Sequence, residues 1–465
     1  MATRRAFLGG AALAGLGLAA MVHHSVHADE EDGIRLFHQT QPSEDQLFWE
    51  KNAKPIRTAL IGSGWYGKSD LFRLIQCGGE HVEVKALCDV NQHTLEEAGR
   101  LVAERHACGK VPNLYHDYRE LLEKEELDVC LIGSPDHWHP LQMIAACEAG
   151  CDVYVQKPIG TDVLECAAMY ETARRTKRVV QVGLQRRSTP LLIEAKQRYV
   201  DSNNLGQIAY VNTFCDYGQG NRVLKPTDPP AHLDWKMFCG PAGVQPFYPN
   251  IGWRQFKAFG NGTIGDMGVH IFDMVRWMLK LGWPKKIYAT GGILVNKTGV
   301  VDISDTLNAS FLFDDLTVTW EHRHWSEVRN PRYGWGAEFF GTKGTMLANP
   351  YRYDFHAKNQ PWIRVDAALE YDKYPTDEHE PGLERNIAGA NRAHMWNFLA
   401  RIIDRKRPNS DIEEGYISSA CCILANLSQE LGGAELEWNP ETKQTNDARA
   451  NELLARKYHE SWVHP

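Results

Sequence analysis

Apolar and polar residues along the first half of the chain follow two alternating periods. Short apolar runs typical of buried strands are separated by stretches in which apolar residues recur every three or four positions, as in amphipathic helices. The predicted strands are 56–62, 82–88, 127–133, 152–156 and 179–183. The predicted helices are 66–77, 92–106, 138–149 and 161–177. Alternating strands and helices predict a doubly wound parallel sheet, and we assign residues 55–185 to this α/β domain.

The second half of the chain has longer apolar runs that partly alternate with polar residues. This pattern is typical of a largely antiparallel sheet with one face packed on helices. The predicted strands are 206–217, 285–295, 303–313, 316–322 and 337–340, and the predicted helices are 266–281, 391–405 and 413–431. We expect residues 186–440 to form an α+β domain with a large, mostly antiparallel sheet, followed by a C-terminal tail over 441–465.

The N-terminal segment stands apart from both patterns. Residues 3–8 (TRRAFL) resemble a twin-arginine export signal, 9–22 are mildly apolar, and 26–28 (VHA) offer a small-x-small cleavage site. We therefore predict a signal peptide over 1–28 and a protein that is periplasmic or otherwise exported by the twin-arginine route. An amphipathic arm or a short anchor is the alternative. Residues 29–54 are polar with aromatic patches and should form an extended arm that docks on a surface, such as a neighbouring subunit.

Composition excludes some classes of function. The 465 residues are 43% hydrophobic and carry a net charge of −8 without a basic stripe, so we expect no nucleic-acid partner. No stretch is long and apolar enough to anchor the mature protein in a membrane. The eleven cysteines include no C-x-x-C pair, which argues against structural zinc, and they do not resemble a disulfide framework. The remaining expectation is a globular protein with a small-molecule site.

The predicted strand 56–62 runs directly into a glycine-rich turn, and a predicted helix follows. The turn reads Gly62-Ser63-Gly64-Trp65-Tyr66-Gly67. A G-x-G-x-x-G turn between a strand and a helix is typical of dinucleotide binding. The first glycine allows a tight turn, the second lets backbone N–H groups approach a pyrophosphate, and the third lets the helix pack on the strand. Glycine triplets also occur in ordinary loops, but here we predict that all six residues bind a cofactor.

Asp89 follows the next predicted strand. It lies about 25 positions after Gly64, close to the roughly 20-residue spacing of a carboxylate that binds the adenosine ribose. A carboxylate in that place repels a 2′-phosphate, so NAD is favoured over NADP. The alternative is a plain turn residue at a strand end.

Two further polar segments follow predicted strands, at the sheet edge where open α/β sheets bind ligands. Residues 133–139 (GSPDHWH) should form the rim of the cofactor site through Ser134, Pro135, His137 and His139. We expect no metal there, because loop histidines without a carboxylate partner are usually not ligands; a helix N-cap is the alternative role.

Gln156 and Lys157 end the predicted strand 152–156, and we expect both to lie at the cofactor site. A lysine at that strand end points toward the nicotinamide end of the crevice. The alternative for Lys157 is an ordinary surface lysine.

A third polar cluster opens the predicted helix 266–281. Asp266, His270 and Asp273 fall at i, i+4 and i+7 and should share one face of that helix. Histidine suits proton transfer near neutral pH, and a carboxylate can orient it. Asp266 alone could equally be an N-cap. The cluster predicts a tuned acid/base pair.

Four motifs together resemble the Gfo/Idh/MocA family (glucose–fructose oxidoreductase and inositol dehydrogenase). They are the glycine turn, the S-P-D-H-W-H loop, the K-P turn at Lys157 and the D-x-G-x-H helix, and the resemblance covers about 56–432. It implies a Rossmann domain, and a C-terminal domain whose open sheet often mediates homo-oligomers. It also implies that Lys157 and His270 are catalytic and that Asp266 contacts substrate. One departure is Gln156, where the family usually has Glu.

The resemblance implies hydride transfer between a sugar-like secondary alcohol and the nicotinamide of NAD. His270 would take the hydroxyl proton, Lys157 would stabilise the developing alkoxide, and Asp266 would orient the substrate hydroxyl and His270. Asp273 is a further candidate substrate contact. Four more come from polar segments that could instead be surface loops: Gln185, Arg186, Trp253 and Arg254.

Export leaves little free NAD to exchange, so we expect a tightly retained cofactor. One alternative function is an NAD-dependent, redox-neutral glycosidase, in which transient oxidation of the sugar acidifies a neighbouring C–H. The resemblance implies that exported family members include such glycosidases, whose usual motif lacks the D-x-G-x-H helix. Another alternative is a non-catalytic sugar- or nucleotide-binding protein on the same scaffold. The main prediction is an oxidoreductase acting on CH–OH groups of carbohydrates.

Overall fold

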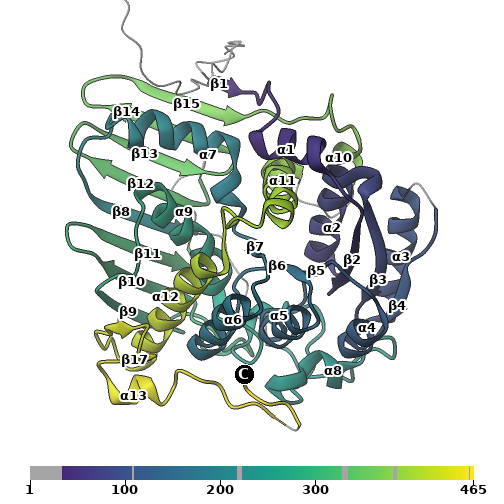
Figure 1. The fold of residues 1–465 in the computed structure, drawn as a ribbon. Coiled ribbons are helices and arrows are strands. Elements are labelled where there is room, and N and C mark those ends of the chain that lie inside the picture. Colours follow the sequence, from purple (N-terminus) through teal and green to yellow (C-terminus); the bar gives the residue numbers. More distant parts are fainter. Residues whose placement is uncertain (1–33, 107–108, 217–222, 327–332, 381–384, 460) are drawn as a thin grey trace, which may run out of the picture.

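The described chain folds into two large sheets with their helices and one small two-stranded sheet (Figure 1). The computed structural model describes residues 34–106, 109–216, 223–326, 333–380, 385–459 and 461–465. The predicted signal peptide over 1–28 lies outside the described residues. Among the helices within those ranges, none is both long and apolar enough to cross a membrane.

A six-stranded parallel sheet forms the N-terminal domain, in the order β4-β3-β2-β5-β6-β7. Its strands are β2 (Ile56–Ile61), β3 (Val82–Cys88), β4 (Asn113–Tyr115), β5 (Val129–Ile132), β6 (Asp152–Val155) and β7 (Val180–Val182). Its helices are α2 (Trp65–Gly78), α3 (Gln92–Arg105), α4 (Tyr118–Lys124), α5 (His139–Glu148) and α6 (Val163–Thr176). The predicted doubly wound sheet is confirmed. The pattern misses only β4 and α4, which are short.

The strand order positions the ligand site. Strands β3 and β4 lie on one side of β2, and the next strand, β5, lies on the other side of β2. The strand order therefore reverses between β2 and β5. Ligands of open α/β sheets bind outside the carboxyl ends of the strands at such a reversal. The segments that follow β2, β5 and β6 therefore meet at one edge.

A nine-stranded sheet forms the second domain, in the order β1-β15-β14-β13-β12-β8-β11-β10-β9. Neighbouring strands are antiparallel except for two parallel pairs, β1 with β15 and β8 with β11. The strands after β7 are β8 (Ile208–Cys215), β9 (Lys286–Gly292), β10 (Thr306–Leu312), β11 (Thr317–Arg323), β12 (Trp335–Gly341), β13 (Gly344–Asn349), β14 (Arg352–Ala357) and β15 (Trp362–Ala367). The mostly antiparallel sheet is confirmed and is larger than predicted.

The sequence pattern misses β13, β14 and β15. In β14 the apolar Tyr353 and Phe355 alternate with Arg352, Asp354 and His356. Half of such a strand is charged or polar, so it does not read as an apolar run. Pairing with β13 on one side and β15 on the other makes it a strand.

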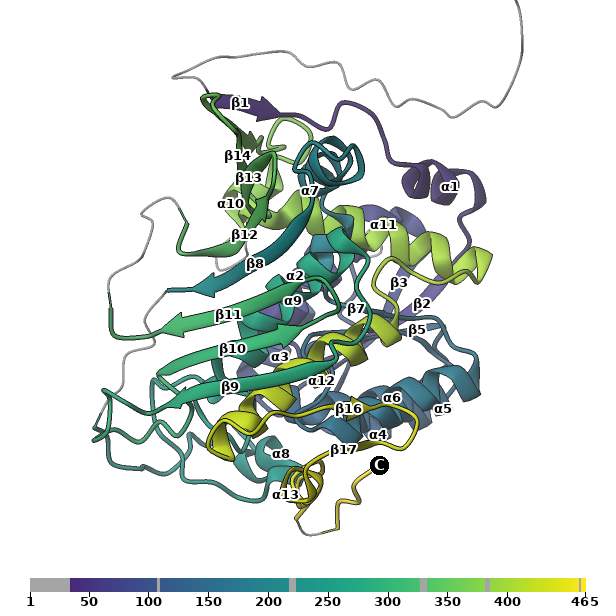
Figure 2. The same cartoon turned by 90° about the vertical axis from the view of Figure 1, so that its left-hand side faces the viewer.

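Helices cover one face of the large sheet. These are α7 (Pro190–Ala195), α9 (Val269–Leu279) and α12 (Ile412–Glu430), and Figure 2 shows α9 and α12 behind strands β9–β11. Phe272 of α9 packs on Phe311 of β10 with ring centroids 4.2 Å apart. On the opposite face Tyr210 and Phe340 are exposed and stack on each other.

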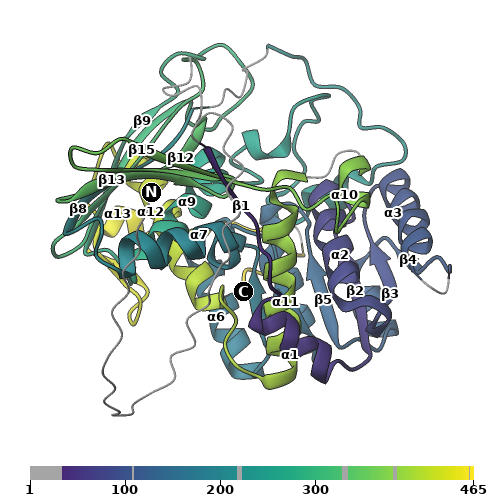
Figure 3. The same cartoon turned by 90° about the horizontal axis from the view of Figure 1, so that it is seen from above.

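The described part of the predicted N-terminal arm, from Ile34 on, docks on a surface of its own chain. β1 (Ile34–Phe37) extends the large sheet beside β15, and α1 (Glu44–Asn52) packs on α11 (Ala388–Asp404) with Trp49 buried. In turn α11 packs on α2 of the N-terminal domain (Figure 3). The sequence pattern assigns α11 to the second domain, but its apolar side chains join the core of the first.

Five short elements complete the α-helices and β-strands of the described residues. They are α8 (Trp235–Cys239), α10 (Thr376–His379), α13 (Ala448–Asn451), β16 (Trp438–Asn439) and β17 (Gln444–Thr445).

Candidate active site

The glycine turn lies between β2 and α2. Gly62 has φ +88°, and a Cβ there would lie 2.3 Å from the backbone nitrogen of Ser134. A Cβ on Gly67 would lie 1.9 Å from the carbonyl oxygen of Gly62, so only glycine lets the helix pack this closely. A Cβ on Gly64 would meet no atom within 4 Å, which leaves the turn open on the side where a pyrophosphate approaches.

A cavity of about 410 Å³ opens beside this turn. Its lining includes the predicted residues Gly62, Gly64, Trp65, Tyr66, Asp89, Ser134 and Pro135. The two oxygens of Asp89 accept the backbone N–H groups of Ser63 and Asn91, each over 2.8 Å. Burial raises the pKa of Asp89, and these N–H donors and Lys68 oppose the shift. An open glycine turn with a carboxylate at the next strand end fits NAD.

A second cavity, of about 310 Å³, adjoins the first and shares Trp65, Tyr66, Ser134 and Arg254 with it. It brings together the three predicted catalytic residues, which come from distant parts of the chain: Lys157, Asp266 and His270. The predicted residues His139, Gln156 and Arg186 also line it. The first cavity is therefore suited to a cofactor and the second to a substrate.

Lys157 and Asp266 form an ion pair at the wall of the second cavity. The Lys157 ammonium donates to Asp266 Oδ1 over 2.6 Å and to its carbonyl oxygen over 3.0 Å, and Arg254 Nε lies 3.3 Å from the same Oδ1. Burial would raise the pKa of Asp266, but Lys157 and Arg254 outweigh it and lower that pKa to about 2. Asp266 is thus an ionised carboxylate that holds Lys157 in place.

His270 is buried and in contact with Arg186. Arg186 Nη1 lies 3.2 Å from His270 Nε2, and His270 Nδ1 has no hydrogen-bond partner within the described residues. Burial first, then the charges of Arg186 and Lys157, lower the pKa of His270 well below its ordinary value. The imidazole is therefore neutral and accepts the arginine N–H at Nε2, so its proton sits on Nδ1.

Asp273 does not share the face predicted for it. It binds Arg187 through two hydrogen bonds of 2.8 Å and accepts another from Ser418, and it does not line the cavity. His270 and Asp273 both lie in the regular helix α9, three residues apart, so their side chains point about 60° apart around its axis. His270 faces the cavity, and Asp273 is turned toward Arg187 and Ser418. The predicted His270–Asp273 pair and the substrate contact at Asp273 are wrong.

The two histidines predicted as cofactor contacts in the loop after β5 have different surroundings in the structure. His139 lies between two carbonyl oxygens, with Nδ1 2.7 Å from Pro158 and Nε2 2.8 Å from Ser134, and so braces the loop against the turn after Lys157. His137 instead points its Nε2 at the carbonyl oxygen of Phe238 over 2.9 Å and lines neither cavity. The prediction of a cofactor contact at His137 is therefore wrong.

Of the remaining predicted substrate contacts, two line the site. Arg254 lies at both cavities and Trp253 at the first, with the guanidinium 4.2 Å from the indole centroid. Gln185 lines neither cavity and donates to the Tyr66 hydroxyl over 2.8 Å, so it supports a wall residue rather than a substrate.

Asp136 lies in the predicted rim segment 133–139 but is not among the contacts predicted there, and the structure makes it a site residue. It lines the second cavity and is 3% exposed. Burial raises its pKa to about 8, although Arg254 and Lys157 oppose the shift. Its place after a strand in the ligand-binding edge is the signal that could have found it. Trp335 and Tyr351, also in the lining, come from the large sheet and carry no such signal.

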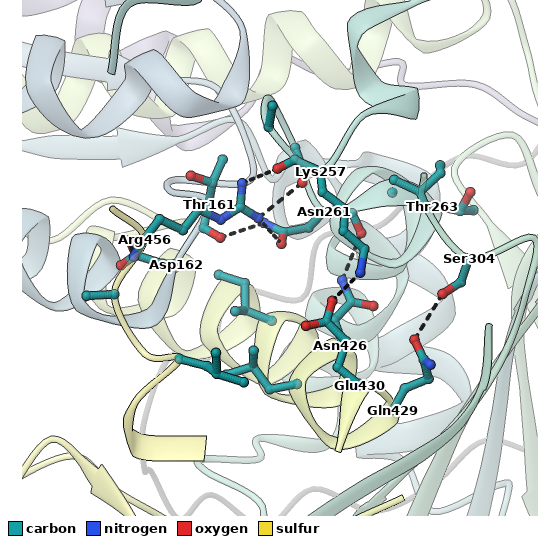
Figure 4. A pocket seen from close by; sticks show the side chains of 18 of the residues that line it. Thr161, Asp162, Lys257, Asn261, Thr263, Ser304, Asn426, Gln429, Glu430 and Arg456 are labelled. Carbon is teal, nitrogen blue, oxygen red and sulfur yellow. Dashed lines mark hydrogen bonds and ion pairs between the residues drawn. The ribbon is translucent and has the colours of Figure 1, made fainter. Parts of the chain in front are cut away.

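A further cavity, of about 430 Å³, lies outside this site, between α12, the segment after α13 and the loop before Ile264 (Figure 4). Its polar side chains bind one another: Arg456 donates to Lys257 O and Asn261 Oδ1, and Lys257 pairs with Glu430.

At one end of this cavity lies the only cluster among the described residues with metal-ligand spacing: Asp162, Glu165 and His464. Asp162 and Glu165 form the capping box of α6, and Asp162 also accepts the Arg456 N–H, so these oxygens already have donors.

Comparison with known proteins agrees with this geometry. A family model described as the Gfo/Idh/MocA oxidoreductase family, with an NAD-binding Rossmann fold, matches residues 56–184, and a Gfo/Idh/MocA C-terminal domain matches 193–347. The chain belongs to the Gfo/Idh/MocA oxidoreductase family. The predicted oxidoreductase class and the NAD cofactor are confirmed by this membership.

Relatives cover most of this Gfo/Idh/MocA protein. A glycosyl hydrolase family 109 protein of Shewanella sp. (strain W3-18-1) is 30% identical over 448 residues, which are 92% of each chain. The uncharacterised oxidoreductase YrbE of Bacillus subtilis (strain 168) is 26% identical over 66% of this chain and 80% of its own. The solved structure of levoglucosan dehydrogenase with NADH and levoglucosan shares the fold, with TM-score 0.63, 18% identity, and 83% and 99% of the two chains covered.

Proposed function

We propose that this oxidoreductase oxidises a hydroxyl group of a sugar or sugar-like molecule and keeps its NAD bound between turnovers. The observation that carries the proposal is the meeting of Lys157, Asp266 and His270 at one cavity that adjoins the glycine turn. A proton acceptor, a fixed cation and a neighbouring dinucleotide cavity are what oxidation of an alcohol requires.

NAD, when bound, supplies the nicotinamide C4 that accepts the hydride. The turn Gly62–Gly67 and Asp89 would hold its pyrophosphate and its adenosine ribose. Side chains of the protein carry out the remaining steps. The neutral His270 takes the proton of the substrate hydroxyl, and the Lys157 ammonium stabilises the oxygen as charge develops on it. The sugar would thus lose a proton to His270 and a hydride to the nicotinamide, and a carbonyl group would remain on the sugar.

Asp266 acts on Lys157 rather than on His270. Its carboxylate is bound to the Lys157 ammonium and lies near Arg254, and no hydrogen bond joins it to His270 in the described structure. We therefore assign Asp266 the roles of orienting Lys157 and contacting the substrate. The orientation of His270, predicted for a carboxylate, falls to Arg186.

The proposal is tested by the contents of the purified protein. Denaturation of protein taken from the periplasm should release near-stoichiometric NAD(H) and little NADP(H), measured by mass and absorbance. Sugars are then screened by reduction of the bound nicotinamide. A protein that contains no dinucleotide and also fails to bind added NAD would remove the proposal.

A redox-neutral glycosidase is the second candidate. The 30% identical relative that spans 92% of this chain is a glycosyl hydrolase family 109 protein. Asp136, which is protonated at neutral pH, could supply the acid that a leaving oxygen needs. The D-x-G-x-H helix favours the oxidoreductase, because the family resemblance implies that the glycosidases usually lack this motif. Release of a free aglycone from a glycoside, without accumulation of keto-sugar, would select the glycosidase.

We also propose twin-arginine export and a homo-oligomer formed through the open face of the large sheet. Exposed aromatic residues on that face, Tyr210, Phe340 and Trp362, support the interface. Trp362→Glu should lower the molar mass measured by light scattering, whereas Leu47→Glu, at an exposed residue of α1, should not. Replacing Arg4 and Arg5 by lysine should leave the protein in the cytoplasm.

A further inference from the structure

Arg186 is a buried cation at the second cavity without an acidic partner. Its side chain is 4% exposed, and within the described residues no carboxylate lies within ion-pair distance of it. Its one hydrogen bond goes to His270, its Nε has no acceptor, and its guanidinium lies 5.5 Å from the ring of Trp335. Burying an unpaired guanidinium is costly, so such a group needs an explanation.

The neighbouring residue gives a direct comparison. Arg187 is equally buried, yet Nε and Nη2 bind the two oxygens of Asp273, and Nη2 also binds Glu414. The described residues therefore supply acids to one of two adjacent arginines and not to the other. Arg187 is a structural residue, and Arg186 faces a cavity that takes a ligand.

The charges around the cavity point in the same direction. Among the described residues that line the cavity, Asp266 is the one ionised carboxylate beside Lys157, Arg186 and Arg254. The other acid, Asp136, is protonated at neutral pH, and burial lowers the pKa of His270, so His270 adds no charge. The cavity thus has an excess of positive charge that its own residues do not balance.

We propose that the substrate carries a carboxylate and that Arg186 binds it, so that the enzyme acts on a sugar acid of the uronate or aldonate class. The proposal rests on the proposed oxidation of a sugar hydroxyl. A planar guanidinium matches the two oxygens of a carboxylate, and the pair is strong where water is excluded. The pyrophosphate of the cofactor is not the missing anion, because Arg186 does not line the cavity beside the glycine turn.

Binding at Arg186 also couples recognition to proton transfer. Arg186 now donates to the Nε2 lone pair of His270, and its charge disfavours a proton there. A substrate carboxylate would neutralise that charge and draw the N–H away, which leaves Nε2 to the substrate hydroxyl. His270 then becomes a stronger base only when the sugar acid is in place.

The test uses the holoenzyme and sugars that differ at one group. Glucuronate and gluconate are compared with glucose, with the methyl ester of glucuronate and with glucose 6-phosphate, and reduction of the bound nicotinamide is followed. We expect the second-order rate constant for nicotinamide reduction to be about tenfold or more higher for a sugar acid than for its neutral counterpart, as one charge-assisted pair would give. Arg186→Gln should remove this preference mainly by raising the sugar concentration needed for the half-maximal reduction rate, and Arg186→Lys should restore part of the preference.

Arg175→Gln, at an exposed arginine that pairs with Glu148, is the matched control and should keep the preference. Equal rates for acid and neutral sugar, an unchanged preference in Arg186→Gln, or preference for the phosphate would each overturn the proposal. If no sugar in the set turns over, calorimetry decides, because failure of every sugar acid to bind the NAD-loaded protein also overturns it. Absence of bound NAD, by contrast, would count against the proposed function itself.

Discussion

The side-chain amide of Gln156 donates a hydrogen bond to the buried carboxylate of Asp70, with Nε2 2.6 Å from Oδ2. Its oxygen accepts the backbone N–H of Lys157 over 3.3 Å, so the amide joins α2 to the start of the catalytic turn. The space is tight, because a Cβ on Gly183 would lie 2.6 Å from the amide nitrogen. The glutamine that stands where the family usually has glutamate is therefore matched to an acid beside it.

Gln156→Glu should destabilise the protein, because it places a second carboxylate at hydrogen-bonding distance from Asp70. We expect a loss of about 2–4 kcal/mol in the free energy of unfolding, measured by urea titration. The double variant Asp70→Asn/Gln156→Glu exchanges the two groups and should recover most of this loss. The interaction energy of the double-mutant cycle is the decisive quantity, and a value near zero would rule out the pairing.

His270→Asn should lower kcat by about 10²- to 10⁴-fold, because the variant loses the group that takes the hydroxyl proton. NAD should remain bound, since His270 does not line the cavity beside the glycine turn. Single-turnover reduction of the bound nicotinamide measures the effect on chemistry, and the released NAD verifies that the fold is intact. Full activity in the variant would remove the general-base assignment.

Ionisation of Asp136 should weaken the binding of a carboxylate substrate at alkaline pH. Burial raises its pKa from the ordinary 3.8 to about 8, against Arg254, Lys157 and Arg456 and with the help of the negative Asp266. As pH rises through about 8 the group ionises and reduces the positive charge of the cavity. KM for a carboxylate substrate should therefore rise above that pH. Asp136→Asn should remove this rise, and an identical profile in the variant would refute the assignment.

The raised pKa of Asp136 also makes the free energy of unfolding depend on pH. Between pH 3.8 and about 8 the folded chain holds a proton on Asp136 that the unfolded chain releases. The contribution of this group to stability is therefore largest in acid and falls as pH rises through that window. Urea titrations across the window should show a shallower decline for Asp136→Asn than for the native chain.

Asp89→Asn separates the two roles of Asp89. The amide oxygen can still accept one of the N–H groups that Asp89 holds, those of Ser63 and Asn91, but the charge that repels a 2′-phosphate is lost. We expect the ratio of NAD to NADP affinity to fall by about tenfold, roughly the worth of one charge at short range in a polar site. Reconstitution of stripped protein with each dinucleotide measures the ratio. An unchanged ratio would assign Asp89 to the turn alone.

Local sequence determined the cofactor half of the site. The turn Gly62–Gly67 and the acid after β3 depend on backbone sterics and on a strand end, which short stretches specify by themselves. Lys157 could be predicted for the same reason, because the carboxyl ends of parallel strands share one edge. The parallel sheet followed from a simple periodicity of apolar residues.

Only the tertiary structure decided which polar side chains face the substrate. The sequence treated Asp273 and Arg186 alike as candidate contacts, and packing gave Asp273 to Arg187 while it left Arg186 at the cavity. Residue spacing places His270 and Asp273 on neighbouring positions of α9, and only the packing around that helix shows that one faces the cavity and the other faces Arg187. Whether a charged group is paired depends on residues far away in the chain. For that reason motif spacing identified the chemistry of the site, and only the folded chain determined its charge.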